Sequence, residues 1–219
     1  MKKDKLSSPS PRTRVRRLPE LADYEQKSLF DILDEAYVCN IAFNDGESTH
    51  CIPTACWRID DYLYIHGSNG GRLTKALLGG AQASVSVTHI DGLVLARSAF
   101  SHSMNYRSAV IYGFFEQVKG NAKKMEAMDE FMEKIAPGRK DEARPGNEKE
   151  LAATSVMRIS LKEAAAKVSK GGPSDKEEDL NLPVWAGVLP LKVVQGEPIP
   201  VDNQLVPTPN YISQWKSRD

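Results

Sequence analysis

The sequence predicts a mainly β fold with peripheral helices, in the form of an antiparallel barrel or of a sheet curled on itself. About six segments carry strand patterns, and turn sequences at hairpin spacing separate several of them. The clearest pair is residues 37–43 and 48–58, because the Asn-Asp-Gly-Glu sequence at 44–47 is a hairpin signature. Full-length helices do not alternate with these strands, so a doubly wound parallel fold is not expected.

Composition narrows the classes of protein to consider. The chain has 219 residues, and its 29 Lys and Arg balance its 29 Asp and Glu, so the overall charge does not indicate a nucleic-acid partner. No apolar run approaches the ~18 residues of a membrane span, and the basic N-terminus lacks the apolar segment of a signal peptide. Cys39, Cys51 and Cys56 are odd in number and lack paired metal-ligand spacing. We therefore expect a soluble cytoplasmic protein with reduced thiols, without membrane association and without a metal site.

The chain is expected to form one domain with two appendages. Residues 14–195 make up the domain, residues 1–13 a flexible N-terminal arm, and residues 196–219 an extended, proline-rich C-terminal tail. Arg14, Arg16 and Arg17 form a basic patch at the start of the domain. This patch either binds an anion or is a solvated part of the arm.

A glycine-rich turn at residues 67–71 separates a predicted strand at 62–66 from a predicted helix at 72–78. Such a turn can hold a phosphate, because glycines let the backbone come close to the anion and Arg72 and Lys75 add positive charge. The alternative is an ordinary strand-to-helix turn, in which the glycines permit positive φ and Arg72 is solvated. The turn alone does not decide between these interpretations.

The remaining elements follow from periodicity and from breaker residues. Asp23 and Gln26 have the spacing of a capping box, which starts a helix that ends near residue 35. The longest predicted strand is 106–118, and residues 182–194 form a last strand or loop. The other predictions are strands at 83–88 and 154–161, helices at 122–135 and 148–153, a turn at 91–92 and a helical turn at 163–170.

Several single positions carry predictions of their own. Pro53 lies inside a predicted strand, which places that strand at an edge or a bulge, where Thr54 can offer its hydroxyl to a ligand. The methionines of the 122–135 helix share one face and are predicted to lie in the core. Trp185 stands between prolines and a glycine, where its ring either packs or covers a ligand.

Six short blocks together resemble the flavin-nucleotide-binding proteins of the FMN-binding split-barrel superfamily, which are related to pyridoxamine 5′-phosphate oxidase and to nitroimidazole reductases. The order and spacing of the blocks carry the resemblance, which spans about residues 14–190. The blocks are Arg-Val-Arg-Arg-Leu-Pro-Glu at 14–20, Ile-Pro-Thr at 52–54, Tyr-Ile-His-Gly-Ser at 64–68 with Arg72, Asp-Gly-Leu-Val-Leu-Ala-Arg-Ser-Ala-Phe at 91–100, His-Ser-Met-Asn-Tyr-Arg-Ser at 102–108 and Pro-Val-Trp-Ala-Gly-Val-Leu-Pro at 183–190.

The resemblance implies a six-stranded antiparallel split barrel that forms a homodimer, with two FMN molecules in clefts built from both subunits. It implies that Arg72 clamps the phosphate, since a guanidinium fork fits phosphate oxygens. Arg107 is a second phosphate candidate. The implied cofactor-binding residues from the first part of the chain are Ile52, Pro53 and Thr54 at the isoalloxazine edge, His66, Gly67 and Ser68 beneath the ribityl chain, and Arg72. Those on the facing strand are Asn105, Tyr106, Arg107 and Ser108. Trp185 and Gly187 are implied to close the cleft.

The function that the resemblance implies is an FMN-dependent oxidoreductase, with a small-molecule substrate or NAD(P)H as partner and no catalytic side chain identified. Two alternatives are a non-catalytic flavin or haem carrier or sensor, and an interaction protein with an empty cleft. Residues 201–219 show no equivalent of the basic residues with which pyridoxamine 5′-phosphate oxidase holds its substrate phosphate, so vitamin B6 oxidation is not expected. His66 or His102 can ligate haem or stabilise a reduced flavin anion, or serve as hydrogen-bonded structural residues.

Overall fold

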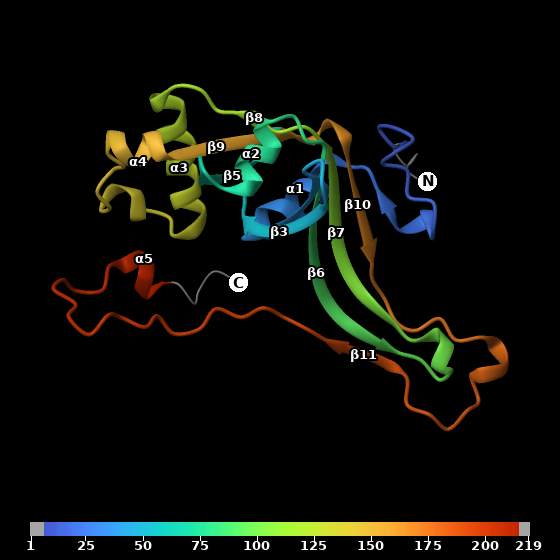
Figure 1. The fold of residues 1–219 in the computed structure, drawn as a ribbon. Helices are drawn as coiled ribbons and strands as arrows, with labels where there is room; N and C mark the ends of the chain where they lie inside the picture. Colours follow the sequence, from blue (N-terminus) through green and yellow to red (C-terminus); the bar gives the residue numbers. More distant parts are fainter. Residues whose placement is uncertain (1–6, 215–219) are drawn as a thin grey trace.

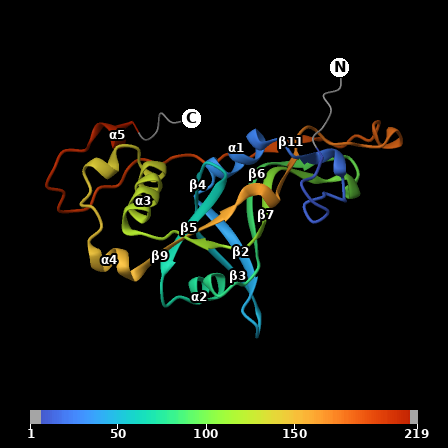
Figure 2. The ribbon, with the colours of Figure 1, turned by 90° about the horizontal axis from the view of Figure 1, so that it is seen from above.

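The computed structural model describes residues 7–214 and contains two antiparallel sheets curled around one core (Figures 1 and 2). This confirms the predicted mainly β fold with peripheral helices. The larger sheet has the order β1 (Ala22–Asp23), β10 (Ala164–Ser169), β7 (Ser103–Gly113), β6 (Ala83–Leu95), β2 (Val38–Asn44) and β3 (Thr49–Ala55), and β11 (Gly187–Pro190) pairs with β6. The smaller sheet has the order β4 (Trp57–Ile59), β5 (Tyr62–Ser68), β9 (Thr154–Ser160) and β8 (Glu116–Gln117).

Helices surround the two sheets, and none of those within residues 7–214 is long and apolar enough to cross a lipid bilayer. The predicted capping box is not observed: Asp23 accepts hydrogen bonds from the amide of Glu25 and the hydroxyl of Ser28 instead. The helices are α1 (Gln26–Glu35), α2 (Arg72–Leu78), α3 (Asn121–Ile135), α4 (Glu148–Ala153) and α5 (Asn210–Ser213), with 3-10 turns η1 (Pro19–Leu21), η2 (Ala99–Ser101), η3 (Arg139–Asp141), η4 (Leu161–Glu163) and η5 (Glu177–Asp179).

The main core lies between the two sheets and α1. Alternating strand residues fill it, such as Ile41 on β2, Leu63 and Ile65 on β5 and Val85 on β6, and all four are fully buried. A second apolar cluster, made of Trp57, Tyr64, Ala127 and Val156, lies between the outer face of the smaller sheet and α3. The buried residues of α3 are Lys124 and Ala127, whereas the three methionines predicted to face the core are only partly buried.

Strand β6 is longer than predicted, and the predicted turn at Asp91-Gly92 is wrong. β6 runs through both residues for 13 residues, compared with 11 for β7, so the strand predicted as the longest is not the longest. A register shift between Ile90 and Gly92 marks the position. A Cβ at Gly92 would lie 3.0 Å from Val188 Cγ1 and 3.1 Å from the carbonyl oxygen of Leu189. The glycine therefore lets β11 approach β6, and does not form a turn.

Two further predictions about local structure are wrong because sheet pairing decides them. Residues 163–170, predicted as a helical turn, form η4 and β10, and β10 pairs with both β1 and β7. Its three alanines favour a helix locally, but burial between strands overrides this preference. The predicted strand 48–58 is two strands in different sheets, β3 and β4, which meet at the buried Cys56. The prediction that Pro53 lies on an edge strand is confirmed, since β3 ends the larger sheet.

β6, β7 and β11 extend beyond the barrel as a three-stranded ribbon, and the tail then runs back outside the barrel to α5 (Figure 1). Val193, Ile199 and Leu205 of this tail are each more than nine-tenths exposed. At the other end, Thr13 is buried and Ser10 donates a hydrogen bond to Glu163. Residues 1–6 of the predicted arm and 215–219 of the predicted tail lie outside the described residues.

Candidate flavin site

The first group of predicted site residues comes together where β3, β5 and α2 meet. Ile52 and Thr54 are partly buried on β3, and Pro53 between them is exposed. Within residues 7–214, β3 pairs with β2 alone, so its other edge leaves backbone groups open to a ligand. Arg72 is the first residue of α2 and is exposed, with Nη1 3.4 Å from Nδ1 of His50 on β3. The guanidinium is therefore placed beside β3 with most of its donors available.

The glycine-rich turn in front of Arg72 is fixed by its neighbours. The backbone amide of Asn69 donates to the carbonyl oxygen of Ala153 (3.1 Å), and its side-chain oxygen accepts a hydrogen bond from Ser155 (2.7 Å). A Cβ at Gly67 would lie 2.8 Å from Oγ1 of the buried Thr74, closer than real Cβ atoms come. The turn and the first turn of α2 are thus packed too closely for any larger residue at position 67.

His66 points to the opposite side of the smaller sheet from the main core. Its ring lies between those of Trp57 and Phe131, with centroids 5.9 and 5.2 Å away. Nδ1 of His66 is buried, and no atom of the described residues forms a hydrogen bond with it; the same is true of Nε1 of Trp57. Burial lowers the pKa of His66, so the imidazole is neutral at pH 7.

The other three histidines are already hydrogen-bonded. His50 contacts Asp45 (2.7 Å) through Nε2, and Nδ1 faces Arg72. Nε2 of His89 lies 3.0 Å from the carbonyl oxygen of Ile32. Nδ1 of the exposed His102 lies 3.0 Å from the carbonyl oxygen of Ser98 at η2. His66 is therefore the one histidine in the described part of the chain with neither ring nitrogen hydrogen-bonded.

The second group of predicted site residues lies elsewhere on the same chain. Residues 105–108 are on β7, which β6 and β2 separate from β3. Three strand spacings amount to about 14 Å. Trp185 is 63% exposed and its ring packs against Gly187 on β11, where a Cβ would lie 2.8 Å from the indole. One chain therefore does not bring the facing-strand residues and Trp185 into contact with Arg72.

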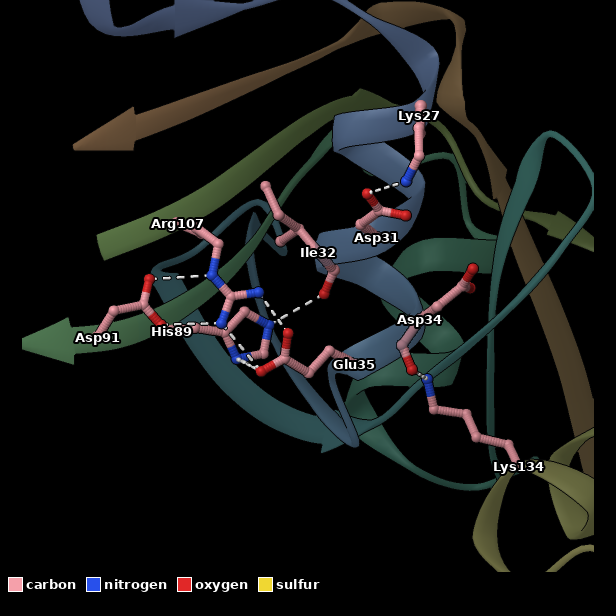
Figure 3. A network of polar contacts seen from close by, with 9 residues as sticks. All are labelled: Lys27, Asp31, Ile32, Asp34, Glu35, His89, Asp91, Arg107 and Lys134. Atoms are coloured by element: carbon pink, nitrogen blue, oxygen red, sulfur yellow. Dashed lines mark hydrogen bonds and ion pairs between the residues drawn. The ribbon is translucent and has the colours of Figure 1, made fainter. Parts of the chain in front are cut away.

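Arg107 belongs to an ion-pair network, shown in Figure 3, and was predicted as a second phosphate ligand. Its Nε and Nη2 donate to the two oxygens of Asp91 at 2.9 and 2.8 Å, and both terminal nitrogens donate to Glu35 at the end of α1. The hydrogen bonds from Arg107 lower the pKa of Glu35 and of Asp91 and raise that of Arg107. Two carboxylates thus neutralise Arg107, whereas Arg72 has no carboxylate partner among the described residues.

Sequence reasoning missed two residues that shape this region. His50, which contacts Arg72, lies two positions before Ile52 on the same strand, and the period-two alternation of a strand places the two on one face. Asn69, which ties the turn to α4 and β9, lies between the glycines, and its partners Ala152 and Ser155 are 83 and 86 positions away in the sequence. No group of three His, Cys, Asp or Glu side chains within residues 7–214 is arranged to hold a metal ion.

Comparison with known proteins gives a match to one protein family and to several solved structures. Residues 25–168 match the protein family described as pyridoxamine 5′-phosphate oxidase. The flavocytochrome Anf3 from Azotobacter vinelandii is 37% identical, with a TM-score of 0.92, over 96% of this chain and 99% of its own. The FAD and haem binding protein from Mycobacterium smegmatis is 34% identical, with a TM-score of 0.85, over 90% of this chain and 97% of its own.

A more distant structure, a 5-nitroimidazole antibiotic resistance protein from Bacteroides thetaiotaomicron, shares the fold. It is 19% identical, with a TM-score of 0.57, over 67% of this chain and 86% of its own. No curated protein sequence matches the chain. The two matches above 30% identity cover nearly the whole chain.

Proposed function

Because this chain belongs to the pyridoxamine 5′-phosphate oxidase family of flavin-binding split barrels, we propose that it is a homodimeric flavocytochrome that acts as an oxidoreductase. One observation carries the proposal: a flavocytochrome matches 96% of the chain at 37% identity. Bound flavin and haem would together supply two-electron and one-electron redox chemistry, for which the protein contributes binding and orientation.

In this proposal the flavin binds where β3, β5 and α2 meet, as FAD and not as FMN. The description of the Mycobacterium smegmatis relative names FAD, which supports this choice. Arg72 binds a phosphate oxygen pair, because its guanidinium is exposed and no carboxylate of the described residues neutralises it. The open edge of β3 hydrogen-bonds the isoalloxazine, and Asn69 and Ser155 keep the turn beside it in position.

The dimer is proposed because one chain places its two groups of site residues on β3 and β7, two strands that β2 and β6 separate. A second copy can bring its residues 105–108 and Trp185 over the Arg72 group of the first. The exposed apolar side chains of the tail support this, since Val193, Ile199 and Leu205 cost free energy in water and are covered if the tail lies along a partner subunit. The cleft then excludes water from two sides.

The residue proposed to hold haem is His66. Its ring has a lone pair committed to no hydrogen bond within residues 7–214, it is neutral, and two aromatic rings fix its orientation. These properties suit a neutral imidazole ligand to iron. His66 lies on β5, which also borders the proposed flavin site, and its ring lies on the outer face of the smaller sheet against Trp57 and Phe131.

The experiment is a visible spectrum of the purified protein, followed by mass identification of the released cofactors. We expect a flavin band and a Soret band, with FAD and haem released. The His66→Ala variant is expected to lose the Soret band and keep the flavin, and His102→Ala to keep both. A colourless protein that takes up neither cofactor contradicts the proposal. Turnover with NADH or NADPH and an electron acceptor separates an oxidoreductase from a carrier.

A further inference from the structure

A cavity of about 530 Å³ lies between α3, η3, the loop after η3, and α4. Figures 1 and 2 show α3 and α4 beside each other at the end of the molecule away from the ribbon. The cavity is lined by one continuous stretch of chain, residues 125–154, and by none of the predicted cofactor-binding residues. Its volume falls in the range of small-molecule sites.

The wall formed by α3 is apolar and adaptable. Met125, Met128 and Met132 follow one another at spacings of three and four residues, so they share one face of the helix. Leu151 of α4 continues this wall, and the Sδ atom of Met125 is in van der Waals reach of a Cβ at Gly146. Thioether side chains are unbranched and polarisable, so they suit flat aromatic ligands.

The rim of the cavity carries an excess of negative charge. Arg144 is neutralised by a two-point contact with Glu150, at 2.7 and 3.2 Å, and Lys140 lies 3.8 Å from Glu133. Asp129 and Asp141 also line the cavity, and neither carboxylate has a hydrogen bond or ion pair within residues 7–214. Two uncompensated carboxylates beside a thioether wall favour a cation with an apolar body.

We propose that this cavity is a binding site for a planar aromatic cation, and its lining includes none of the residues assigned above to the flavin or to haem. The aromatic body lies against the three methionines, and the positive charge lies at the rim between Asp129 and Asp141. The site is complete within one chain. Its occupant can therefore bind without dimerisation.

The test uses isothermal titration calorimetry on the protein as purified, with three ligands of one shape. 9-Aminoacridine is a cation, acridine is neutral and acridine-9-carboxylate is an anion at slightly alkaline pH. We expect one 9-aminoacridine per chain, with acridine at least tenfold weaker and the carboxylate weaker still. Equal affinities for the three compounds would overturn the proposal.

Variants locate the binding. Replacing both rim carboxylates, Asp129→Asn with Asp141→Asn, should weaken 9-aminoacridine at least tenfold, and Ala143→Trp, which fills the cavity, should abolish binding. The matched control replaces two exposed carboxylates of α3 that do not line the cavity, Glu126→Gln with Glu130→Gln, and should bind normally. Circular dichroism and the flavin spectrum establish that each variant is folded. Unchanged binding in folded Ala143→Trp, or equal loss in the control, contradicts the site.

Discussion

Arg107 and Asp91 form a two-point ion pair across the neighbouring strands β7 and β6, with N to O distances of 2.9 and 2.8 Å (Figure 3). The pair lies next to the register shift of β6, and the same guanidinium also binds Glu35 at the end of α1. One side chain thus connects the ribbon to the barrel.

Removing this connection should destabilise the fold. Arg107→Ala leaves Asp91 and Glu35 without their shared cation, so the free energy of unfolding should fall by about 1–2 kcal/mol, a range reduced for partial exposure. Urea denaturation measures the change. Lys27→Ala, which breaks a far more exposed pair with Asp31, should change stability by less than about 0.5 kcal/mol and serves as the control.

The same network predicts a dependence of stability on pH. Arg107 lowers the pKa of Glu35 and Asp91 from ordinary values of 4.5 and 3.8. Groups with lowered pKa stabilise the folded state above their ordinary pKa, and this contribution is lost as pH falls below about 4. The melting temperature between pH 6 and pH 3 should therefore fall less in Arg107→Gln than in the unmodified protein. If the melting temperature falls equally with pH in both proteins, the network contributes nothing to acid stability.

A side chain at position 67 should be tolerated only if the side chain of Thr74 is shortened. Gly67→Ala places a Cβ 2.8 Å from Oγ1 of Thr74, so it should cost about 1–3 kcal/mol and weaken flavin binding. Adding Thr74→Ala removes that oxygen, and the double variant should recover part of the loss. Denaturation and flavin absorbance test both effects. A double variant no better than Gly67→Ala would mean that the contact is not the cause.

The proposed two-chain cleft can be tested by complementation. Arg72→Ala and Trp185→Ala homodimers should both bind flavin poorly, because each has two damaged clefts. A heterodimer of the two variants, purified through different tags, has one intact cleft and one with both defects. It should bind about half the flavin of the unmodified dimer. No recovery in the heterodimer would place both residues in a cleft made by one chain.

Local sequence signals were sufficient for part of the fold. The hairpin of β2 and β3, the helix α2 after its glycines and the helix α3 appear close to their predicted bounds, because turn residues and periodicity act within a few positions. β10 could not be predicted in this way, since its alanines favour a helix until β7 and β1 pair with it. The Asp-Gly sequence at 91–92 is a turn signal locally, but β11, about 100 residues later, uses the glycine for close approach.

The candidate site also depends on contacts between residues far apart in the sequence, which local signals do not predict. Residues 52–54 and Arg72 lie on neighbouring elements, because β3, β5 and α2 are close in sequence. The environment of Arg107 was not predictable, since Glu35 lies 72 positions away and nothing near either residue indicates their contact. Sequence reasoning also placed the α3 methionines in the core, and Met128 does pack against the second apolar cluster, but Met125, Met128 and Met132 also line a cavity.

The most direct test of the central proposal is the affinity of the protein for FAD when position 72 is changed. We predict that Arg72→Ala raises the dissociation constant by about 100-fold, since a charge-assisted phosphate contact is worth about 1.5–3 kcal/mol. The dissociation constant of Arg72→Lys should lie between those of Arg72→Ala and the unmodified protein. Lys75→Ala, one turn further along α2, should bind FAD as the unmodified protein does. An Arg72→Ala variant that binds FAD with unchanged affinity would contradict the account.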